Sequence, residues 1–258
     1  MEFIVNCYNK IDLKLSWEGK MMKTIRKTAI VMLLCVYFLT YGVLPQVEAG
    51  KDTPVIVVAH RAGAKVAPEN TLAALEQAIR DGVPIAEIDV QQLSDGTLIV
   101  MHDSNFKRTA GEDVCVWDTE ADVLSTLEVG SAFSAAYRGE QIPTLEEMLA
   151  CAGGRITLMI ELKYTGQEQE LEESVLALLQ EYDMVGECII GSMNKGILQR
   201  VKELEPDIST VYIAHDLGED DYDLDYADSY SIEWKNLTTA MVETIHYEGK
   251  SVYGWTAN

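Results

Sequence analysis

The stretch "EIDVQQLSDGTLIVMHD", residues 87–103, joins two β-branched, apolar runs through a Ser-Asp-Gly turn. This pattern predicts a β-hairpin. Its first arm carries Glu87 and Asp89 two residues apart, so both side chains lie on one face of the strand. Its second arm ends at His102. Such an acidic pair is usually a solvated strand face, and its meaning depends on the residues around it.

On either side of this hairpin, short apolar runs alternate with helical patterns. Strands are predicted at 55–59, 85–90, 155–163, 187–192, 209–214, 228–234 and 250–256, and helices at about 71–80, 142–154, 167–182, 194–204 and 238–247. This alternation predicts an α/β fold with a parallel sheet. The strands read as continuous apolar runs, as expected where both faces of a sheet are covered.

Polar side chains follow these strands at the points where they end. His60 and Arg61 end the first strand, and Glu161 and Lys163 lie near the end of the third. In parallel α/β barrels the carboxyl ends of the strands form one face, which holds the functional site. We therefore expect these residues to lie close to the acidic pair of the hairpin.

Three carboxylates in such a site, Glu87, Asp89 and Glu161, would repel one another unless something compensated their charge. A divalent cation would do so. Ligands that are all oxygen suit Mg²⁺ or Ca²⁺ better than Zn²⁺. The sequence therefore predicts one divalent cation, Ca²⁺ or Mg²⁺, at this position.

Four other residues at the same strand ends suit acid–base and anion chemistry. His60 and His102 could supply an acid and a base near neutral pH. Arg61 and Lys163 could hold an anion such as a phosphate. Two of them have a simpler interpretation, a turn for His102 and a structural ion pair with Glu161 for Lys163. Their coincidence at neighbouring strand ends favours a catalytic site.

Several ordered blocks resemble the glycerophosphodiester phosphodiesterases, relatives of the phosphatidylinositol-specific phospholipases C. The blocks are "HRAGAKVAPENT", "EIDVQQLSDGTLIVMHD", "IPTLEEML", "IELK", "GSMNKGILQRVKELEP" and "VYGWTAN", and they run from about residue 55 to the C-terminus. The resemblance implies a TIM-like (β/α)8 barrel. It assigns the metal, the acid–base pair and the phosphate contacts to the same residues as above. Trp255, at the end of the last strand, would line the alcohol pocket or pack in the core.

The resemblance implies metal-dependent hydrolysis of a small-molecule glycerophosphodiester to an alcohol and sn-glycerol 3-phosphate. The cation, Arg61 and Lys163 would stabilise charge on the phosphate, and the histidines would move protons. Two other functions fit the same residues. One is a phospholipase D-like activity on lysophospholipids, and the other is a non-catalytic binding protein or inactive fragment.

Two features depart from the family pattern. "HRAGAK" holds an extra residue in the loop over the expected phosphate. The sequence also stops at "GWTAN", where the family continues with a helix and a strand. Seven parallel strands are predicted, and a closed barrel needs eight. We therefore expect a barrel truncated before its final helix and strand, with two strand edges exposed.

Residues 1–49 are predicted to be an N-terminal extension and signal peptide. Three basic residues precede an apolar run at 29–44, and a small-residue site for cleavage ends at Ala49. Translation is expected to begin at Met21 or Met22. The protein would then be secreted or extracytoplasmic, and anchored to a membrane only if this segment stays uncleaved.

The remaining residues, 50–258, form the expected barrel domain. The chain has a net charge of −22, and residues 1–49 carry six Lys/Arg against four Asp/Glu, so the domain carries −24. Such a charge repels nucleic-acid backbones, and no nucleic-acid partner is expected. The cysteine spacing fits no zinc site. His215 and His246 are interpreted as residues without a functional role.

Overall fold

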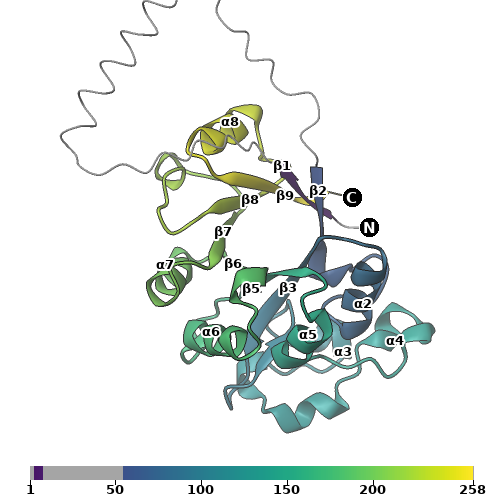
Figure 1. Cartoon of the computed structure of the whole chain (residues 1–258). Coiled ribbons are helices and arrows are strands. Elements are labelled where there is room, and N and C mark those ends of the chain that lie inside the picture. Colours follow the sequence, from purple (N-terminus) through teal and green to yellow (C-terminus); the bar gives the residue numbers. More distant parts are fainter. Residues whose placement is uncertain (1–2, 8–54, 258) are drawn as a thin grey trace, which may run out of the picture. The chain divides into compact units, whose positions relative to one another are not determined.

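The structure, a computed structural model, describes residues 3–7 and 55–257 (Figure 1). The strands are β1 (Phe3–Cys7), β2 (Val55–Ala59), β3 (Ile85–Gln92), β4 (Leu98–Val100), β5 (Thr157–Leu162), β6 (Cys188–Ser192), β7 (Ser209–Ala214), β8 (Ser229–Glu233) and β9 (Ser251–Ala257). They pair in the order β2-β1-β9-β8-β7-β6-β5-β3-β4, and a further β2–β3 pairing closes the ring. Seven of these strands were predicted from sequence: β2, β3 and β5 to β9. Wherever two of the seven pair with each other, they run parallel. The predicted TIM-like barrel is confirmed.

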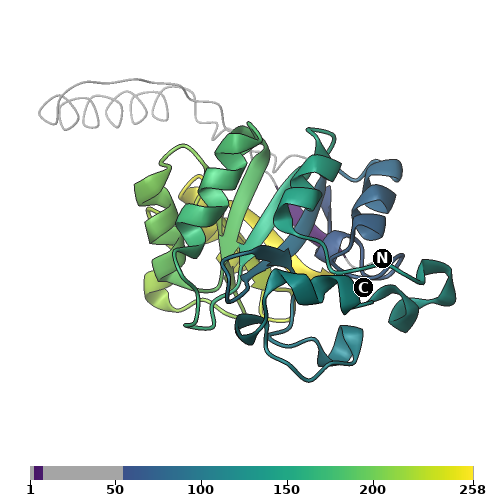
Figure 2. The ribbon, with the colours of Figure 1, turned by 90° about the horizontal axis from the view of Figure 1, so that it is seen from below.

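Helices lie outside the ring of strands (Figure 2). The longer ones are α2 (Leu72–Arg80), α5 (Leu145–Ala152), α6 (Leu171–Glu181), α7 (Lys195–Leu204) and α8 (Thr239–Tyr247). Most begin within three residues of the predicted position. Helix α6 begins four residues late because the Glu168 carboxylate accepts hydrogen bonds from the backbone of Thr165 and Gly166, which fixes a turn there.

A long connection, residues 101–144, lies between β4 and α5, and no structure was predicted for most of it. It contains two short helices, α3 (Lys107–Ala110) and α4 (Gly130–Phe133), and several 3₁₀ turns. Phe106, which is 1 % exposed, belongs to a separate apolar cluster that packs beneath this connection. Pieces of three to six residues are too short for a helical period to appear in the sequence.

Strand β1 lies between β2 and β9 and runs antiparallel to both. Its register runs from Phe3 opposite Ala59 to Cys7 opposite Val55, and Cys7 also lies opposite Val252. The two strand edges that were expected to be exposed are therefore paired. The sequence predicts no role in the barrel for these N-terminal residues. The signal peptide predicted between Met21 and Ala49 lies outside the described residues.

The interior of the barrel is apolar at one end and charged at the other. One cluster of buried side chains joins strands from around the ring: Val58, Ile85, Met159, Val211 and Tyr253. Because strand side chains alternate, the next inward positions on a strand lie two and four residues further on. On β3 and β5 those positions carry carboxylates and a lysine, so the sequence pattern itself places charge at the carboxyl ends of the strands.

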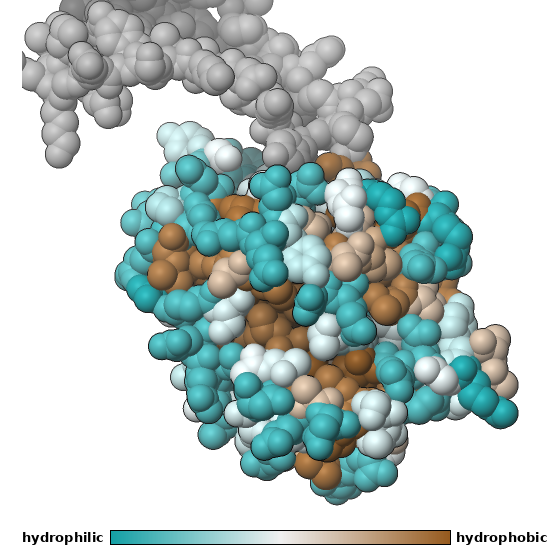
Figure 3. All heavy atoms as spheres, turned by 60° about the horizontal axis from the view of Figure 1, so that its bottom comes forward, coloured by the Kyte–Doolittle hydropathy of each residue, from teal (hydrophilic) through white to brown (hydrophobic). Residues whose placement is uncertain are grey.

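Hydrophilic residues cover much of the surface. The face shown in Figure 3 has apolar surface gathered near its middle, with hydrophilic residues around it. Among the helices of the described residues, none is long and apolar enough to cross a bilayer.

Removing the pairing of β1 should destabilise the barrel. Val5 pairs with Val57 on one side and lies opposite Gly254 on the other. Val5→Pro removes the backbone N–H and leaves a ladder partner unpaired, which should lower the free energy of unfolding by about 1–3 kcal/mol, or the melting temperature by about 2 °C or more. Val5→Thr keeps the N–H and is the control. Equal melting temperatures for the two variants would show that β1 contributes nothing to stability.

Candidate active site

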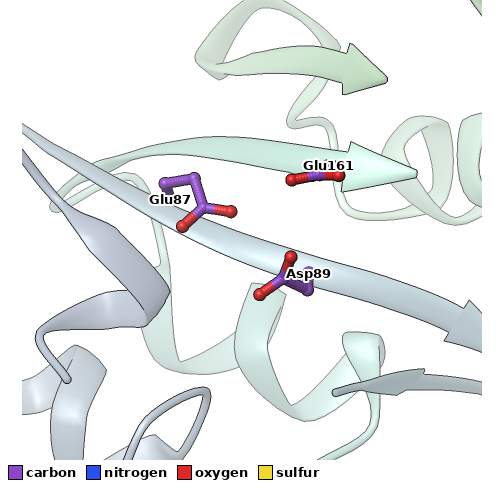
Figure 4. Close-up of side chains that lie close together, drawn as sticks. All are labelled: Glu87, Asp89 and Glu161. Carbon is purple, nitrogen blue, oxygen red and sulfur yellow. The ribbon is translucent and has the colours of Figure 1, made fainter. Parts of the chain in front are cut away.

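Three carboxylates converge at the charged end of the barrel (Figure 4). Glu87 and Asp89 project from β3, and Glu161 projects from β5, where it lies directly opposite Asp89 in the sheet register. One oxygen of each lies within 4.8 Å of the other two. Glu87 and Asp89 are 3 % and 1 % exposed, and the Glu161 side chain is 12 % exposed. The predicted metal ligands are therefore together and nearly removed from solvent.

Neighbouring groups hold each carboxylate in place. The backbone N–H of Arg61 donates to Glu87 at 2.7 Å. Lys163 Nζ donates to Glu161 at 2.9 Å and lies 3.3 Å from Asp89. The Asn70 amide donates to Asp89 at 2.8 Å.

Asn70 and Thr71 precede α2, and both residue types commonly cap helices. The structure separates their roles. Thr71 Oγ1 accepts a hydrogen bond from Ala74 N at 3.2 Å and caps the helix. Asn70 has a positive φ of 56° and turns its amide toward Asp89 instead. This residue is a functional contact that the sequence analysis missed.

Burial and mutual repulsion change the protonation of these groups. Burial, reinforced by the charges of Asp89 and Glu161, raises the pKa of Glu87 well above its usual value. Burial and Asp89 also raise the pKa of Glu161. Burial opposes ionisation of Asp89 as well, but Lys163 and other positive or hydrogen-bonding neighbours lower its pKa overall.

The pKa of Lys163 is also shifted by these neighbours. Burial lowers the pKa of Lys163, but the surrounding carboxylates outweigh burial and raise it to about 12. Lys163 therefore stays charged near neutral pH.

These residues fit a hard divalent cation. The donor atoms are all carboxylate oxygens, and the chain leaves two of the three acids with raised pKa values. A cation among them would favour their ionised forms, and oxygen ligands are those that Mg²⁺ and Ca²⁺ take. The three carboxylates thus form a group that could hold a metal ion.

His60 and Arg61 follow β2 in a short 3₁₀ turn, His60–Ala62, with a tight backbone. Arg61 and Ala62 have φ values of 50° and 59°, a region that non-glycine residues rarely adopt. His60 Nε2 lies 4.0 Å from Glu87 Oε2. Arg61 donates to Glu69 at 2.9 Å, and its Nε is buried without a hydrogen-bond partner among the described residues. Both side chains line the same pocket as the acids.

His102 is held through a chain of charged groups. Its Nδ1 lies 2.8 Å from Asp103 Oδ1. Arg108 donates to Asp103 at 2.7 Å and to Glu69 at 2.6 Å. Hydrogen bonds from Arg108 hold the pKa of Asp103 down at about 2. Because Glu69 also accepts from Arg61, this chain of ion pairs connects the two predicted catalytic segments.

Gln91 fixes the backbone on either side of His102. It lies on β3, is buried, and its amide donates to the carbonyls of Met101 and Asp103 at 2.7 and 2.8 Å. Strand β3 thus supplies two of the carboxylates that could hold a metal ion and also a clamp for the histidine segment. Sequence reasoning did not identify Gln91, although its inward register with Asp89 was a signal for it.

A pocket of about 380 Å³ joins these groups. It is lined by His60, Arg61, Glu87, His102, Met159, Glu161, Lys163, Met193, Ile213, His215, Ser231, Trp255 and Thr256. Trp255, predicted as a pocket residue or a core residue, lies in the lining. His215, interpreted from sequence as a residue without a functional role, also lies in the lining, where it pairs with Glu233 at 3.1 Å and packs on Trp255. His246 lies on α8 and is not part of this lining.

The charge in this site predicts how stability varies with pH. Glu87 has a raised pKa in the folded protein, so its contribution to the free energy of unfolding is greatest below pH 4.5, the usual pKa of a glutamate. That contribution is lost as pH rises through the higher pKa of the folded state. In chelator, Glu87→Gln should therefore gain stability over the wild type by up to about 1.4 kcal/mol per pH unit above that value.

Urea unfolding in chelator, from pH 4.5 to about neutral, measures this difference. Glu243→Gln on α8 removes an exposed acid and is the control. If Glu87→Gln and the control follow the wild type in parallel across this range, the buried acid is not destabilised by its neighbours.

Comparisons with known proteins show the family of this chain. Residues 60–258 match the model of the glycerophosphoryl diester phosphodiesterase family. A glycerophosphodiester phosphodiesterase of Bacillus subtilis is 30 % identical, over 90 % of this chain and 89 % of its own. Another, from Caldanaerobacter subterraneus subsp. tengcongensis, is 31 % identical over 79 % and 86 %.

One solved structure is similar in both fold and sequence. A phosphodiesterase of Oleispira antarctica, in complex with the product sn-glycerol-3-phosphate, is 30 % identical with a TM-score of 0.73. The match covers 78 % of this chain and 84 % of that one. With a family match over most of the barrel, the chain belongs to the glycerophosphoryl diester phosphodiesterase family.

Proposed function

We propose that this protein hydrolyses glycerophosphodiesters to an alcohol and sn-glycerol 3-phosphate, and that a divalent cation is required. The observation that carries the proposal is the convergence of Glu87, Asp89 and Glu161 beside a pocket that His60 and His102 line. The relatives named glycerophosphodiester phosphodiesterases, and the product bound to the Oleispira antarctica protein, support the substrate class.

The three carboxylates would hold the cation, Ca²⁺ or Mg²⁺, through oxygen ligands. When bound, it supplies a Lewis acid for a phosphate oxygen. The residues of the chain provide the surroundings for that chemistry. Asn70 orients Asp89, and the Arg61 backbone N–H orients Glu87, so these two ligands are positioned before anything binds.

Lys163 and Arg61 are the positive groups that face the phosphate. Lys163 stays charged at neutral pH, since its pKa is raised to about 12. Arg61 carries a buried Nε–H with no hydrogen-bond partner among the described residues, 4.0 Å from Asp89. Positive charge fixed in a nearly dry site stabilises negative charge that develops on the phosphate during attack.

His60 and His102 exchange protons with the reacting oxygens. Asp103 accepts from Nδ1 of His102, which leaves Nε2 as the atom that exchanges a proton. One histidine takes a proton from the nucleophile, either water or a neighbouring hydroxyl of the substrate. The other gives a proton to the oxygen of the departing alcohol.

Hydrolysis of glycerophosphocholine by the full chain, followed by release of sn-glycerol 3-phosphate, tests this function. Turnover should require Ca²⁺ or Mg²⁺ and stop in chelator. His102→Ala should lower kcat by about 100-fold or more. His246→Ala, which changes a histidine outside the pocket lining, is the control.

Two results would contradict the proposal. One is turnover that survives both chelator and the His102 substitution, and the other is no turnover of any glycerophosphodiester. Lysophosphatidylcholine in parallel tests the phospholipase D-like alternative, because its acyl chain is the only added group. Faster release of choline from that lipid would assign the site to lysophospholipids instead.

Arg108 is proposed to position His102 through Asp103. Arg108→Ala removes the hydrogen-bond donors that join Asp103 to Glu69. His102 would then be held less firmly, so kcat should fall about 10-fold with little change in KM. Arg108→Lys keeps the charge but loses the two-armed geometry, and should recover part of the activity. An unchanged kcat in the alanine variant would remove Arg108 from the mechanism.

A further inference from the structure

The two halves of the pocket differ in chemistry. Strands β2 to β5 and their ends supply the carboxylates, histidines, arginine and lysine that face the phosphate. Strands β6 to β9 and their ends supply a different set: Met193, Ile213, His215, Ser231, Trp255 and Thr256. This second half, the β6–β9 wall, has no role in the proton or phosphate chemistry described above.

The indole of Trp255 is fixed in the β6–β9 wall. Its Nε1–H donates to the carbonyl of Ser231 at 3.0 Å. Its own carbonyl accepts from the backbone of Trp234 at 2.7 Å. His215 packs against the indole with ring centres 5.1 Å apart and planes tilted by 56°. The aromatic surface therefore has a set orientation in the pocket.

A carboxylate lies beside this aromatic surface. Glu233 is two residues beyond Ser231 on β8, so both project to the inner face, and it lies opposite Trp255 in the sheet register. Its Oε2 accepts from His215 Nδ1 at 3.1 Å. The backbone carbonyl of His215 is itself held by Asn236 at 2.8 Å.

The charge of Glu233 is only weakly balanced by a neighbouring cation. Lys235 Nζ lies 3.7 Å from Glu233 Oε1, but the lysine side chain is 67 % exposed and the glutamate 27 % exposed. Solvent screens such a pair. The chain as a whole carries a charge of −22. The β6–β9 wall therefore presents an aromatic surface, and the negative charge of Glu233 lies behind it, against His215.

We propose that the β6–β9 wall binds the alcohol portion of the substrate and selects alcohols that carry a cationic nitrogen, such as choline or ethanolamine, over uncharged polyols. The inference rests on the proposed phosphodiesterase function and names the substrate class for that site. An ammonium group is attracted both by the face of an indole and by a nearby carboxylate. A polyol head group gains neither interaction.

The experiment compares kcat/KM for glycerophosphocholine and glycerophosphoethanolamine with kcat/KM for glycerophosphoglycerol, using the full chain with its cation. The two cationic substrates should be favoured by about 10-fold. Because attraction to the head group exists before and during reaction, the preference should appear mainly in KM. It should also weaken as salt is raised.

Four substitutions test the residues that carry the inference. Glu233→Gln and Trp255→Leu should each reduce the preference about threefold or more, and Trp255→Phe should reduce it less. Lys235→Ala removes the competing cation and should increase the preference. Glu243→Gln on α8 removes the same charge far along the chain and should leave the preference unchanged.

The outcomes separate this inference from the function on which it rests. Hydrolysis of all three diesters at similar kcat/KM, or a preference that survives both Glu233→Gln and Trp255→Leu, would overturn the inference alone. A preference that falls equally in the Glu243 control would assign it to net charge and also overturn it. Failure to hydrolyse any of the diesters would overturn the proposed function and this inference together.

Discussion

Three carboxylates confined within 4.8 Å of one another, and nearly removed from water, are the constraint on which the rest of this structure depends. Such a group is unfavourable unless its charge is compensated. Lys163 and the Arg61 backbone supply part of that compensation, and the raised pKa values of Glu87 and Glu161 show that it is incomplete. The unfavourable charge suits this group to a cation, because one divalent ion would favour the ionised form of every member.

Strand alternation explains how the barrel places this charge. Inward positions recur every second residue, so the apolar Ile85 is followed by Glu87 and Asp89, and Met159 by Glu161 and Lys163. The apolar residues fill one end of the barrel, and the charges fall at the end where the strands finish. A one-residue shift in register would reverse these positions, so the packing of the core also fixes the geometry of the site.

The same periodicity explains what the sequence could predict. The parallel strands, the three carboxylates and the pocket histidines follow from local patterns and from several motifs in order. Asn70, Gln91, His215 and Glu233 were missed because their roles depend on contacts between residues far apart in the chain. His215 and Glu233 do continue the inward register of β7 and β8, so counting by two from Val211 and Ser231 would have placed both at the mouth. The short helices in residues 101–144 and the pairing of β1 gave no such periodic signal.

The position of β1 connects the fold to the site. Strands β2 and β9 carry the two walls of the pocket at the place where the walls meet, with His60 after β2 and Trp255 in β9. Among the described residues, β1 is the element that joins these two strands, with Phe3 opposite both Ala59 and Ala257. The distance across the pocket, from His60 to Trp255 in the β6–β9 wall, therefore depends on the element that lies between β2 and β9. A five-residue antiparallel strand closes the ring there, and so the spacing of the two walls is a property of the whole barrel.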